Sequence, residues 1–277
     1  RRHRLREGLL NSTSLDDTNF TIESSQIVLE HKVARGAFGN VFKGAWLGTE
    51  VAVKQIDVWS LQDLEAFLDE ANLLAQLHHP NIVQLLGVCD SRNAQGGREM
   101  LLVMEYLQHG SLNEVLLDFN IALTDKRKQQ MALDAAKGML YLHTLLPPVL
   151  HRDLKSPNLL VDERAGRFTV KIADFGLSRF RVEYTMTFCG SPKWTAPEVL
   201  NGENYGTAAD SWSFGVVLWE IATRKVPYAA GTWQPLGISQ GQGEPLARST
   251  RSPLNAARGL AAMAGRGNGP VNSNGVG

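Results

Sequence analysis

The chain has 277 residues, 43% hydrophobic and 20% charged, so it can bury a core and is not disordered throughout. Its 28 basic and 28 acidic residues cancel, which gives no electrostatic reason to expect a nucleic-acid partner. Two cysteines make neither a disulfide framework nor a zinc site, and no apolar run approaches the roughly 18 residues of a membrane span.

Residues 1–26 are polar and lack periodicity, which predicts an N-terminal extension or linker. The chain opens with Arg1 rather than Met, as expected of a fragment or a processed piece. Its basic start is typical of a solvated linker, and the alternative is a segment just inside a membrane span that lies upstream. We therefore expect a cytoplasmic protein, or one on the cytosolic side of a membrane.

Short β-rich runs separated by glycines come next, and they predict an antiparallel meander. The runs cover residues 27–36, 40–48 and 49–57. Apolar residues then recur at helical spacing over 60–77, with Ser60 at the N-cap. Two more strands are expected at 81–89 and 99–107.

After Gly110 the sequence becomes helical. A long helix is expected to start after Thr124 and to stop before Pro147. Residues 210–222 are apolar on nearly every face, which predicts a helix buried on all sides. The pattern indicates an α+β protein with a small β-rich lobe that carries one helix, followed by a larger helical lobe.

The last 47 residues, 231–277, differ from the rest because 14 of them are Gly or Pro. Such a composition is typical of low-complexity sequence, and acidic residues nearly vanish there. We expect no fixed structure over this segment.

Glu70 lies on the apolar stripe of the helix predicted over 60–77, which it shares with Phe67 and Leu74. Leaving one member of a buried ion pair without its partner costs about 3–5 kcal/mol, so a cation is expected to reach this carboxylate. Lys54, at the end of VAVK, is the candidate. The alternative is that Glu70 lies at the solvent edge of the stripe.

The run RGAFGNVFKG places Gly36 and Gly39 in a turn between two strands. Glycines there let backbone N–H groups approach phosphate oxygens, although glycines in hairpins are usually only turn formers. The run departs from G-x-G-x-x-G, because Ala34 stands where the first glycine would be.

The string HRDLKSPN, residues 151–158, interrupts two apolar runs with three charged residues, a proline and an asparagine. Buried charge is costly unless it is paired, bound to metal or used in chemistry. Asp153 is suited to orient a substrate hydroxyl and accept its proton, while Asn158 and Asp174 offer the oxygen ligands that Mg²⁺ prefers. Pro157 prevents a regular helix, so that these groups converge from a loop. For the isolated string, the alternative is a surface salt-bridge cluster.

Taken together, the glycine run, VAVK, the helix glutamate, HRDLxxxN, DFG and APE resemble the protein-kinase signature set in order and spacing. The resemblance covers about residues 27–230 and implies a bilobal protein-kinase fold, ATP and Mg²⁺ as cofactors, and protein substrates. It leaves the oligomeric state open. The roles that it implies are phosphate binding for Lys54 held by Glu70, catalytic base for Asp153, and Mg²⁺ binding for Asn158 and Asp174.

The same resemblance implies which residues contact ATP. Gly36 and Gly39 cover the phosphates, with Ala34 at the start of that loop. Met104 is the gatekeeper of the adenine pocket, although without the resemblance it is an ordinary core methionine. The other implied adenine contacts are the backbone of Glu105 and Leu107 and the side chains of Val41, Ala52 and Leu160.

The catalytic segments combine features of two kinase classes. Lys155 resembles the lysine that reaches the γ-phosphate in serine/threonine kinases, and Ser191 of GSP is suited to bond Asp153. KWTAPE, residues 193–198, resembles tyrosine kinases instead. The mixture resembles the tyrosine-kinase-like group, which includes Raf-like and mixed-lineage kinases and mostly phosphorylates Ser and Thr. Serine/threonine specificity is therefore predicted, with dual specificity as the alternative.

Hydroxyl residues between DFG and APE predict regulation by phosphorylation, with Thr185 and Thr187 favoured over Tyr184. Arg152 is suited to pair with a phosphate there and to order the segment. The alternative is that these hydroxyls belong to an ordinary exposed loop.

The resemblance stops early. In the family, further helices follow residue 230, with an arginine that pairs with the APE glutamate, here Glu198, whereas Asp210, which anchors the catalytic loop, is present. The expected organisation is an extension over 1–26, an N-lobe over 27–108, a partial C-lobe over 109–230 and a tail over 231–277 that is not kinase sequence. The alternative to an active signalling kinase is an impaired kinase-like module that binds nucleotide or partner proteins.

Overall fold

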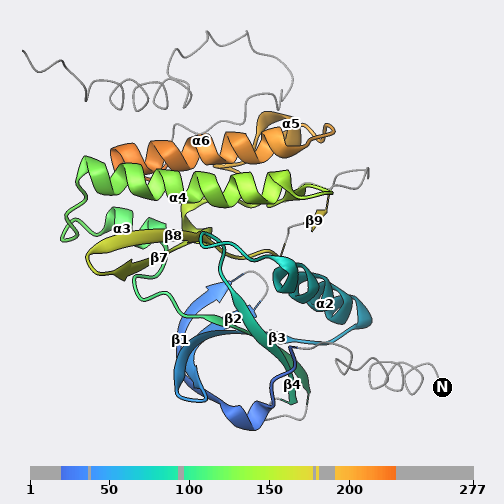
Figure 1. Cartoon of the computed structure of the whole chain (residues 1–277). Coiled ribbons are helices and arrows are strands. Elements are labelled where there is room, and N and C mark those ends of the chain that lie inside the picture. The colour runs from blue at the N-terminus through green and yellow to red at the C-terminus, as the bar shows by residue number, and fades with distance from the viewer. Residues whose placement is uncertain (1–19, 37–38, 93–96, 177–178, 181–190, 229–277) are drawn as a thin grey trace, which may run out of the picture.

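The computed structural model describes residues 20–36, 39–92, 97–176, 179–180 and 191–228, and the structural statements below concern these residues. They form two lobes (Figure 1). One lobe is a curled antiparallel sheet with a single helix beside it. The other is mainly helical, with a small β-hairpin on the side that faces the sheet. This arrangement confirms the predicted α+β class.

The first lobe contains a five-stranded antiparallel sheet in the order β1-β2-β3-β5-β4. Its strands are β1 (Ile27–Gly36), β2 (Gly39–Trp46), β3 (Thr49–Asp57), β4 (Leu85–Arg92) and β5 (Arg98–Glu105). Helix α2 (Leu61–Gln76) follows β3, and the Ser60 hydroxyl caps it by accepting a hydrogen bond from the Asp63 N–H at 3.2 Å. The meander and the N-cap at Ser60 are both confirmed.

The two faces of this sheet carry different side chains, because successive residues of a strand point to opposite sides. On β3, Val51 and Val53 are fully buried in an outer apolar cluster with Leu101 and Val103 of β5. Lys54, the next residue along, points to the other face, toward α2 and the second lobe. The period of two in VAVK therefore places the lysine where the lobes meet.

The N-terminal extension is shorter than the sequence predicts. The Ile22 N–H donates to Val88 O at 2.7 Å, and the Val88 N–H donates to Phe20 O at 2.8 Å, so this segment adds to the free edge of β4. The Ile22 side chain is 5% exposed and joins the outer apolar cluster. A short 3₁₀ turn, η1 (Ser24–Gln26), then leads into β1. Residues 20–26 thus belong to the first lobe.

The strand expected at 81–89 begins only at Leu85. The residues before it bond to the second lobe instead: the Val83 N–H donates to Ile172 O at 2.9 Å, and the Ile172 N–H donates to Asn81 O at 2.9 Å. The backbone groups of Asn81 and Val83 are satisfied across the lobe boundary and not by β5, whereas Gln84 O accepts from the Glu105 N–H of β5.

The second lobe is built around two helices that lie side by side, α4 (Asp125–Thr144) and α6 (Thr207–Thr223) (Figure 1). Its smaller elements are α3 (Leu112–Leu117), β6 (Val149–Leu150), η2 (Ser156–Asn158), β7 (Leu159–Arg164), β8 (Arg167–Ile172), β9 (Arg179–Phe180) and α5 (Pro197–Leu200). Helix α4 starts at the Thr124 N-cap and ends before the prolines, as predicted. None of the described helices combines the length and apolarity required to cross a bilayer.

Helix α6 confirms the expected helix, but its predicted burial on all sides is wrong. Val217 and Ile221 are fully buried, whereas Phe214 and Trp219 are only partly covered. Among the described elements, α6 packs most extensively on α4, and this one-sided packing accounts for the difference.

Candidate active site

The Lys54 ammonium joins the two lobes at the centre of the site. Its Nζ lies 2.7 Å from Glu70 Oε1 on α2 and 3.2 Å from Asp174 Oδ1, which follows β8. Glu70 is 5% exposed, so the alternative position at the solvent edge of the stripe is excluded. The carboxylate that the helical spacing places on the buried face has the predicted partner.

These contacts fix the charge states of the lysine and the aspartate. Burial alone lowers the pKa of Lys54, but the Glu70 and Asp174 carboxylates outweigh it and raise the pKa above its ordinary value. Burial likewise raises the pKa of Asp174, but the Lys54 ammonium holds it below its usual range. Both groups are therefore charged at neutral pH.

Two residues of the site, Asp174 and Arg152, have a left-handed backbone conformation. Their φ angles are 62° and 68°, in a region that non-glycine residues rarely adopt. Phe175 is fully buried, with its ring centroid 5.2 Å from that of His151. The His151 ring nitrogen Nε2 lies 3.1 Å from Ala173 O. Packing on both sides of Asp174 therefore keeps its carboxylate directed at Lys54.

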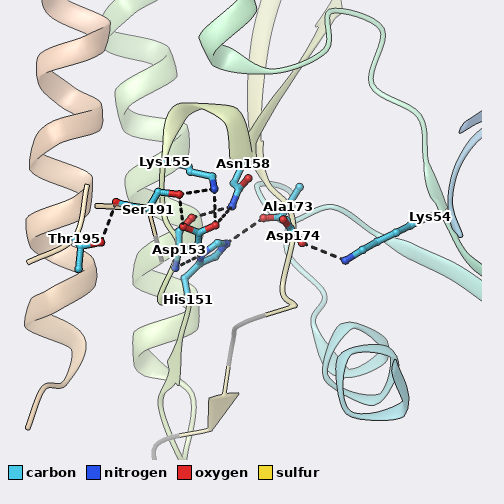
Figure 2. Close-up of polar contacts among 9 residues, drawn as sticks. All are labelled: Lys54, His151, Asp153, Lys155, Asn158, Ala173, Asp174, Ser191 and Thr195. Atoms are coloured by element: carbon cyan, nitrogen blue, oxygen red, sulfur yellow. Dashed lines mark hydrogen bonds and ion pairs between the residues drawn. The ribbon is translucent and has the colours of Figure 1, made fainter. Parts of the chain in front are cut away.

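Asp153 is the centre of a second hydrogen-bond network, which lies on the other side of Asp174 from Lys54 (Figure 2). The Lys155 Nζ donates to Asp153 Oδ2 at 2.6 Å and to Ser191 Oγ at 2.7 Å. The Ser191 hydroxyl in turn donates to Asp153 Oδ1 at 3.0 Å, which confirms the predicted bond. The Thr195 hydroxyl donates to Ser191 O at 2.9 Å and steadies this segment.

Asn158 connects the catalytic loop to the residues before Asp174. Its Nδ2 donates to Asp153 O at 2.9 Å and to Asp153 Oδ2 at 3.1 Å, and the Ala173 N–H donates to Asn158 O at 2.9 Å. The side-chain amide therefore directs its nitrogen at Asp153, which leaves the side-chain oxygen Oδ1 of Asn158 for another partner (Figure 2). Within the described residues, no group of three or more His, Cys, Asp or Glu side chains is placed so that it could hold a metal ion.

Asp210 at the start of α6 anchors the catalytic loop, as predicted. Its Oδ2 accepts from the His151 N–H and its Oδ1 from the Arg152 N–H, both at 2.9 Å. The His143 ring nitrogen Nε2 of α4 lies 2.9 Å from the same Oδ2. Asp210 is 2% exposed, so these contacts hold the strained turn from inside the lobe.

The glycine loop joins β1 to β2. Gly36 pairs with Gly39 at the end of the hairpin, and Ala34 pairs with Val41 two residues further in. Gly39 has φ 146°, and a Cβ there would lie 2.1 Å from Gln55 O, so no other residue fits this close approach to β3. Residues 37–38, at the tip of the loop, lie outside the described residues.

The implied adenine contacts come together on the inner face of the sheet. Ala52 of β3 pairs with Met104 of β5, and Val41 of β2 pairs with Lys54. Met104 and Leu160 pack against one apolar cluster, which consists of Val83, Leu107 and Ala173. The side chains predicted from β2, β3 and β5 thus share one face of the sheet, and Leu160 of β7 packs with Met104 against the same apolar cluster.

Glu105 uses part of its polar capacity within the protein. Its N–H donates to Gln84 O at 3.1 Å, and its carboxylate accepts two bonds from the Lys171 Nζ at 2.6 and 2.7 Å. The Glu105 N–H is thus already used within the protein, and the backbone bonds from Glu105 and Leu107 to adenine stay a prediction. The pair with Lys171 of β8 also ties the segment between the lobes to the second lobe.

Some predicted regulatory residues lie outside the described part of the chain. Thr185 and Thr187 fall in the range 181–190, so their phosphorylation stays a prediction. Arg152 is described, and its guanidinium carbon lies 5.8 Å from the centroid of the Tyr205 ring.

Several residues of the site were missed by sequence reasoning. They are His143 and Lys171, described above, and Ser156, Trp194 and Glu220, which bond one another beneath the catalytic loop. Polar residues inside the apolar helix over 210–222 were the signal that could have found Glu220.

Comparison with known proteins agrees with this geometry. The family model described as protein tyrosine and serine/threonine kinase matches residues 27–251. This match reaches beyond residue 230, and the boundary predicted there stays a prediction.

The curated relatives are serine/threonine kinases by name. The chain is 47% identical over 230 residues to the "Probable serine/threonine-protein kinase drkC" of Dictyostelium discoideum, which covers 80% of this chain and 30% of that protein. It is 43% identical over 210 residues to drkB of the same organism, with 75% and 29% covered. It is 40% identical over 224 residues to the "Serine/threonine-protein kinase CTR1" of Arabidopsis thaliana, with 77% and 26% covered.

The chain thus spans less than a third of the length of these relatives. The matched region holds the Lys54 ion pairs, the Asp153 network and the glycine loop described above. The chain belongs to the protein tyrosine and serine/threonine kinase family.

Proposed function

We propose that this domain transfers the γ-phosphoryl group of ATP to serine and threonine hydroxyls of proteins in intracellular signalling. The observation that carries the proposal is the network in which Lys155 bridges Asp153 and Ser191. It is supported by a Lys54 ammonium that bonds both Glu70 and Asp174.

In the proposed reaction the hydroxyl oxygen of the substrate forms a bond to the γ-phosphorus while the bond to the β–γ bridging oxygen breaks, which releases ADP. Asp153 orients the hydroxyl and accepts its proton. Its Oδ1 accepts one described hydrogen bond, from Ser191, and a carboxylate oxygen has room for about two. Lys54 would hold the α- and β-phosphates of ATP, and Lys155 would supply positive charge at the γ-phosphate.

The donor set fits Mg²⁺. Asp174 stays ionised because Lys54 lowers its pKa, and the Asn158 amide turns its nitrogen toward Asp153, so each residue offers an oxygen. When bound, the ion would neutralise phosphate charge, with its remaining ligands coming from water and the phosphates.

Serine/threonine specificity is supported by Lys155 and Ser191. The lysine bonds both Asp153 and Ser191, an arrangement that matches the serine/threonine pattern predicted for these two residues. The relatives that match this chain carry the same specificity in their names.

The test is phosphate transfer from labelled ATP with Mg²⁺ to a peptide library that presents Ser, Thr and Tyr equally. Asp153→Asn is the matched control, because the amide keeps the shape of the carboxylate but cannot accept the proton. We expect label on Ser and Thr, and a loss of about 10²-fold or more in the variant. Label mainly on Tyr would contradict the specificity.

If neither the parent protein nor Asp153→Asn transfers phosphate, but ATP still raises the unfolding temperature of each, the domain is a nucleotide-binding module and the proposal fails. Silence without any ATP-dependent shift would leave protein binding as the remaining function of the fold.

A further inference from the structure

Helix α6 carries a line of buried polar side chains on the face toward the catalytic loop. Asp210, Ser213 and Glu220 lie three and seven residues apart, a spacing that keeps them on one helical face. Their exposures are 2%, 8% and 2%. Asp210 is explained by its bonds to the backbone of the catalytic loop, whereas Glu220 has no part in the mechanism described so far.

Glu220 accepts two short hydrogen bonds from two different segments. The Ser156 hydroxyl donates to its Oε1 at 2.6 Å, and the Trp194 indole N–H donates to its Oε2 at 2.8 Å. No basic side chain of the described residues forms an ion pair with it. Burial raises the pKa of Glu220, while the bonds from Ser156 and Trp194 and the charge of Lys193 act in the opposite direction.

The first donor belongs to the catalytic loop itself. Ser156 lies directly after Lys155 and begins the turn η2 (Ser156–Asn158), in which the Asn158 N–H donates to Lys155 O at 2.9 Å. Ser156 is fully buried. Its side chain therefore fixes the loop between the lysine that bonds Asp153 and the asparagine that bonds Asp153.

The second donor belongs to the segment that carries Ser191. The Trp194 N–H donates to Ser191 O at 2.9 Å, which closes a turn over residues 191–194. The Ser213 hydroxyl donates to Trp194 O at 2.7 Å, so α6 holds this residue through both its backbone and its indole. Trp194 thereby fixes the turn from which Ser191 reaches Asp153.

We propose that Glu220 is a positioning residue that sets the spacing between the catalytic loop and the 191–195 segment, and through it the Lys155–Asp153–Ser191 network. The inference rests on the proposed function, because that network is where the protein substrate is expected to bind. The two carboxylate oxygens of Glu220 each accept a hydrogen bond from one of these two segments.

Paired acceptance explains why a carboxylate occupies this buried position. A buried charge without a counter-charge is costly, and an apolar side chain of similar size would pack there at lower cost. An apolar side chain would leave the Ser156 hydroxyl and the Trp194 indole without acceptors. A glutamine keeps both contacts but accepts only one of them: its oxygen accepts from the Trp194 indole, and its NH₂ donates to the Ser156 oxygen, so that Ser156 changes from donor to acceptor.

The experiment compares Glu220→Gln, Glu220→Ala and the exposed-surface control Glu203→Ala in the full chain, with rates corrected for the folded fraction. We expect Glu220→Ala to lower kcat/KM for a Ser/Thr peptide by about tenfold or more, while KM for ATP changes by less than about twofold. Glu220→Gln and Glu203→Ala should stay within about threefold of the parent protein.

A purely structural role predicts a smaller folded fraction with unchanged constants for both substrates. That result would overturn the proposal, and so would a glutamine variant as impaired as the alanine variant.

Two further variants test whether both segments act through Glu220. Ser156→Ala and Trp194→Phe each remove one donor, and each should lower kcat/KM for the peptide in the parent protein. In the Glu220→Ala background neither should have a further effect, because the acceptor is already absent. Additive losses would contradict a shared role.

A readout that needs no activity separates this inference from the proposed function. Hydrogen exchange of the Trp194 and Asn158 backbone amides should accelerate in Glu220→Ala but not in Glu220→Gln. If the parent protein transfers no phosphate, the proposed function fails, yet faster exchange at both amides still supports the positioning role. Unchanged exchange at either amide refutes it.

Discussion

At the residue scale, Lys54 decides whether the site holds together. Its ammonium forms ion pairs with the buried Glu70 carboxylate and with Asp174. A cation with two anionic neighbours stabilises the fold and the site at once. Substitutions at this position therefore have two separable effects.

Replacement of the ammonium by Lys54→Met should abolish phosphate transfer and should also destabilise the fold. Removal of the cation from a buried ion pair such as Lys54–Glu70 costs about 3–5 kcal/mol. Urea unfolding measures the loss of stability. The double variant Lys54→Met/Glu70→Leu should regain most of it without regaining activity, and a double variant as unstable as the single one would contradict the ion-pair account.

A pH prediction follows from Glu220, whose pKa is raised by burial above the ordinary value of 4.5. Because the folded state holds this proton more tightly than the unfolded state, the free energy of unfolding gains from this group as the pH falls through the raised pKa toward 4.5. In Glu220→Gln this gain should be absent. Chemical unfolding from pH 7 downward measures it, and identical pH profiles would refute the prediction.

At the element scale, the segment before β1 completes the sheet. The Ile22 side chain packs directly on Gly87, so that a Cβ at position 87 would lie 2.4 Å from the Ile22 Cδ1. Truncation of a buried isoleucine costs about 2–5 kcal/mol, so Ile22→Ala should lower the free energy of unfolding by an amount in that range. Val28→Ala, at a side chain 61% exposed, is the control and should change it by less than about 0.5 kcal/mol.

The same elements show what the sequence can and cannot reveal. Glu70 and Ser60 were predictable, because helical spacing and capping are local rules. Phe20–Ile22 was missed because its partner Val88 is distant in sequence, and three residues are too few to show a period. Glu220 was missed because an apolar helix was read as uniformly buried, although a polar residue within it needed its own donors.

At the scale of the whole molecule, the lobes are joined by contacts from residues that neighbour the proposed nucleotide site. The Glu105–Lys171 pair and the backbone bonds between Val83 and Ile172 link the sheet to the second lobe. A ligand that bridges the lobes should therefore stabilise the fold as a unit.

ATP with Mg²⁺ should raise the free energy of unfolding by about 2.7 kcal/mol at a hundredfold excess over its dissociation constant. Chelation of the metal should shrink this gain, since Asn158 and Asp174 offer their oxygens to the ion and not to the phosphates. Calorimetry of the protein with ATP, with and without chelator, measures both. A gain that is independent of the metal would argue against these two ligands.

Because Lys54 bonds both Glu70 and Asp174, the position of its ammonium depends on two elements at the same time. The two carboxylates are carried by α2 and by the segment after β8, so each reports the position of a different element. A displacement of either element would therefore remove one of the two ion pairs of Lys54.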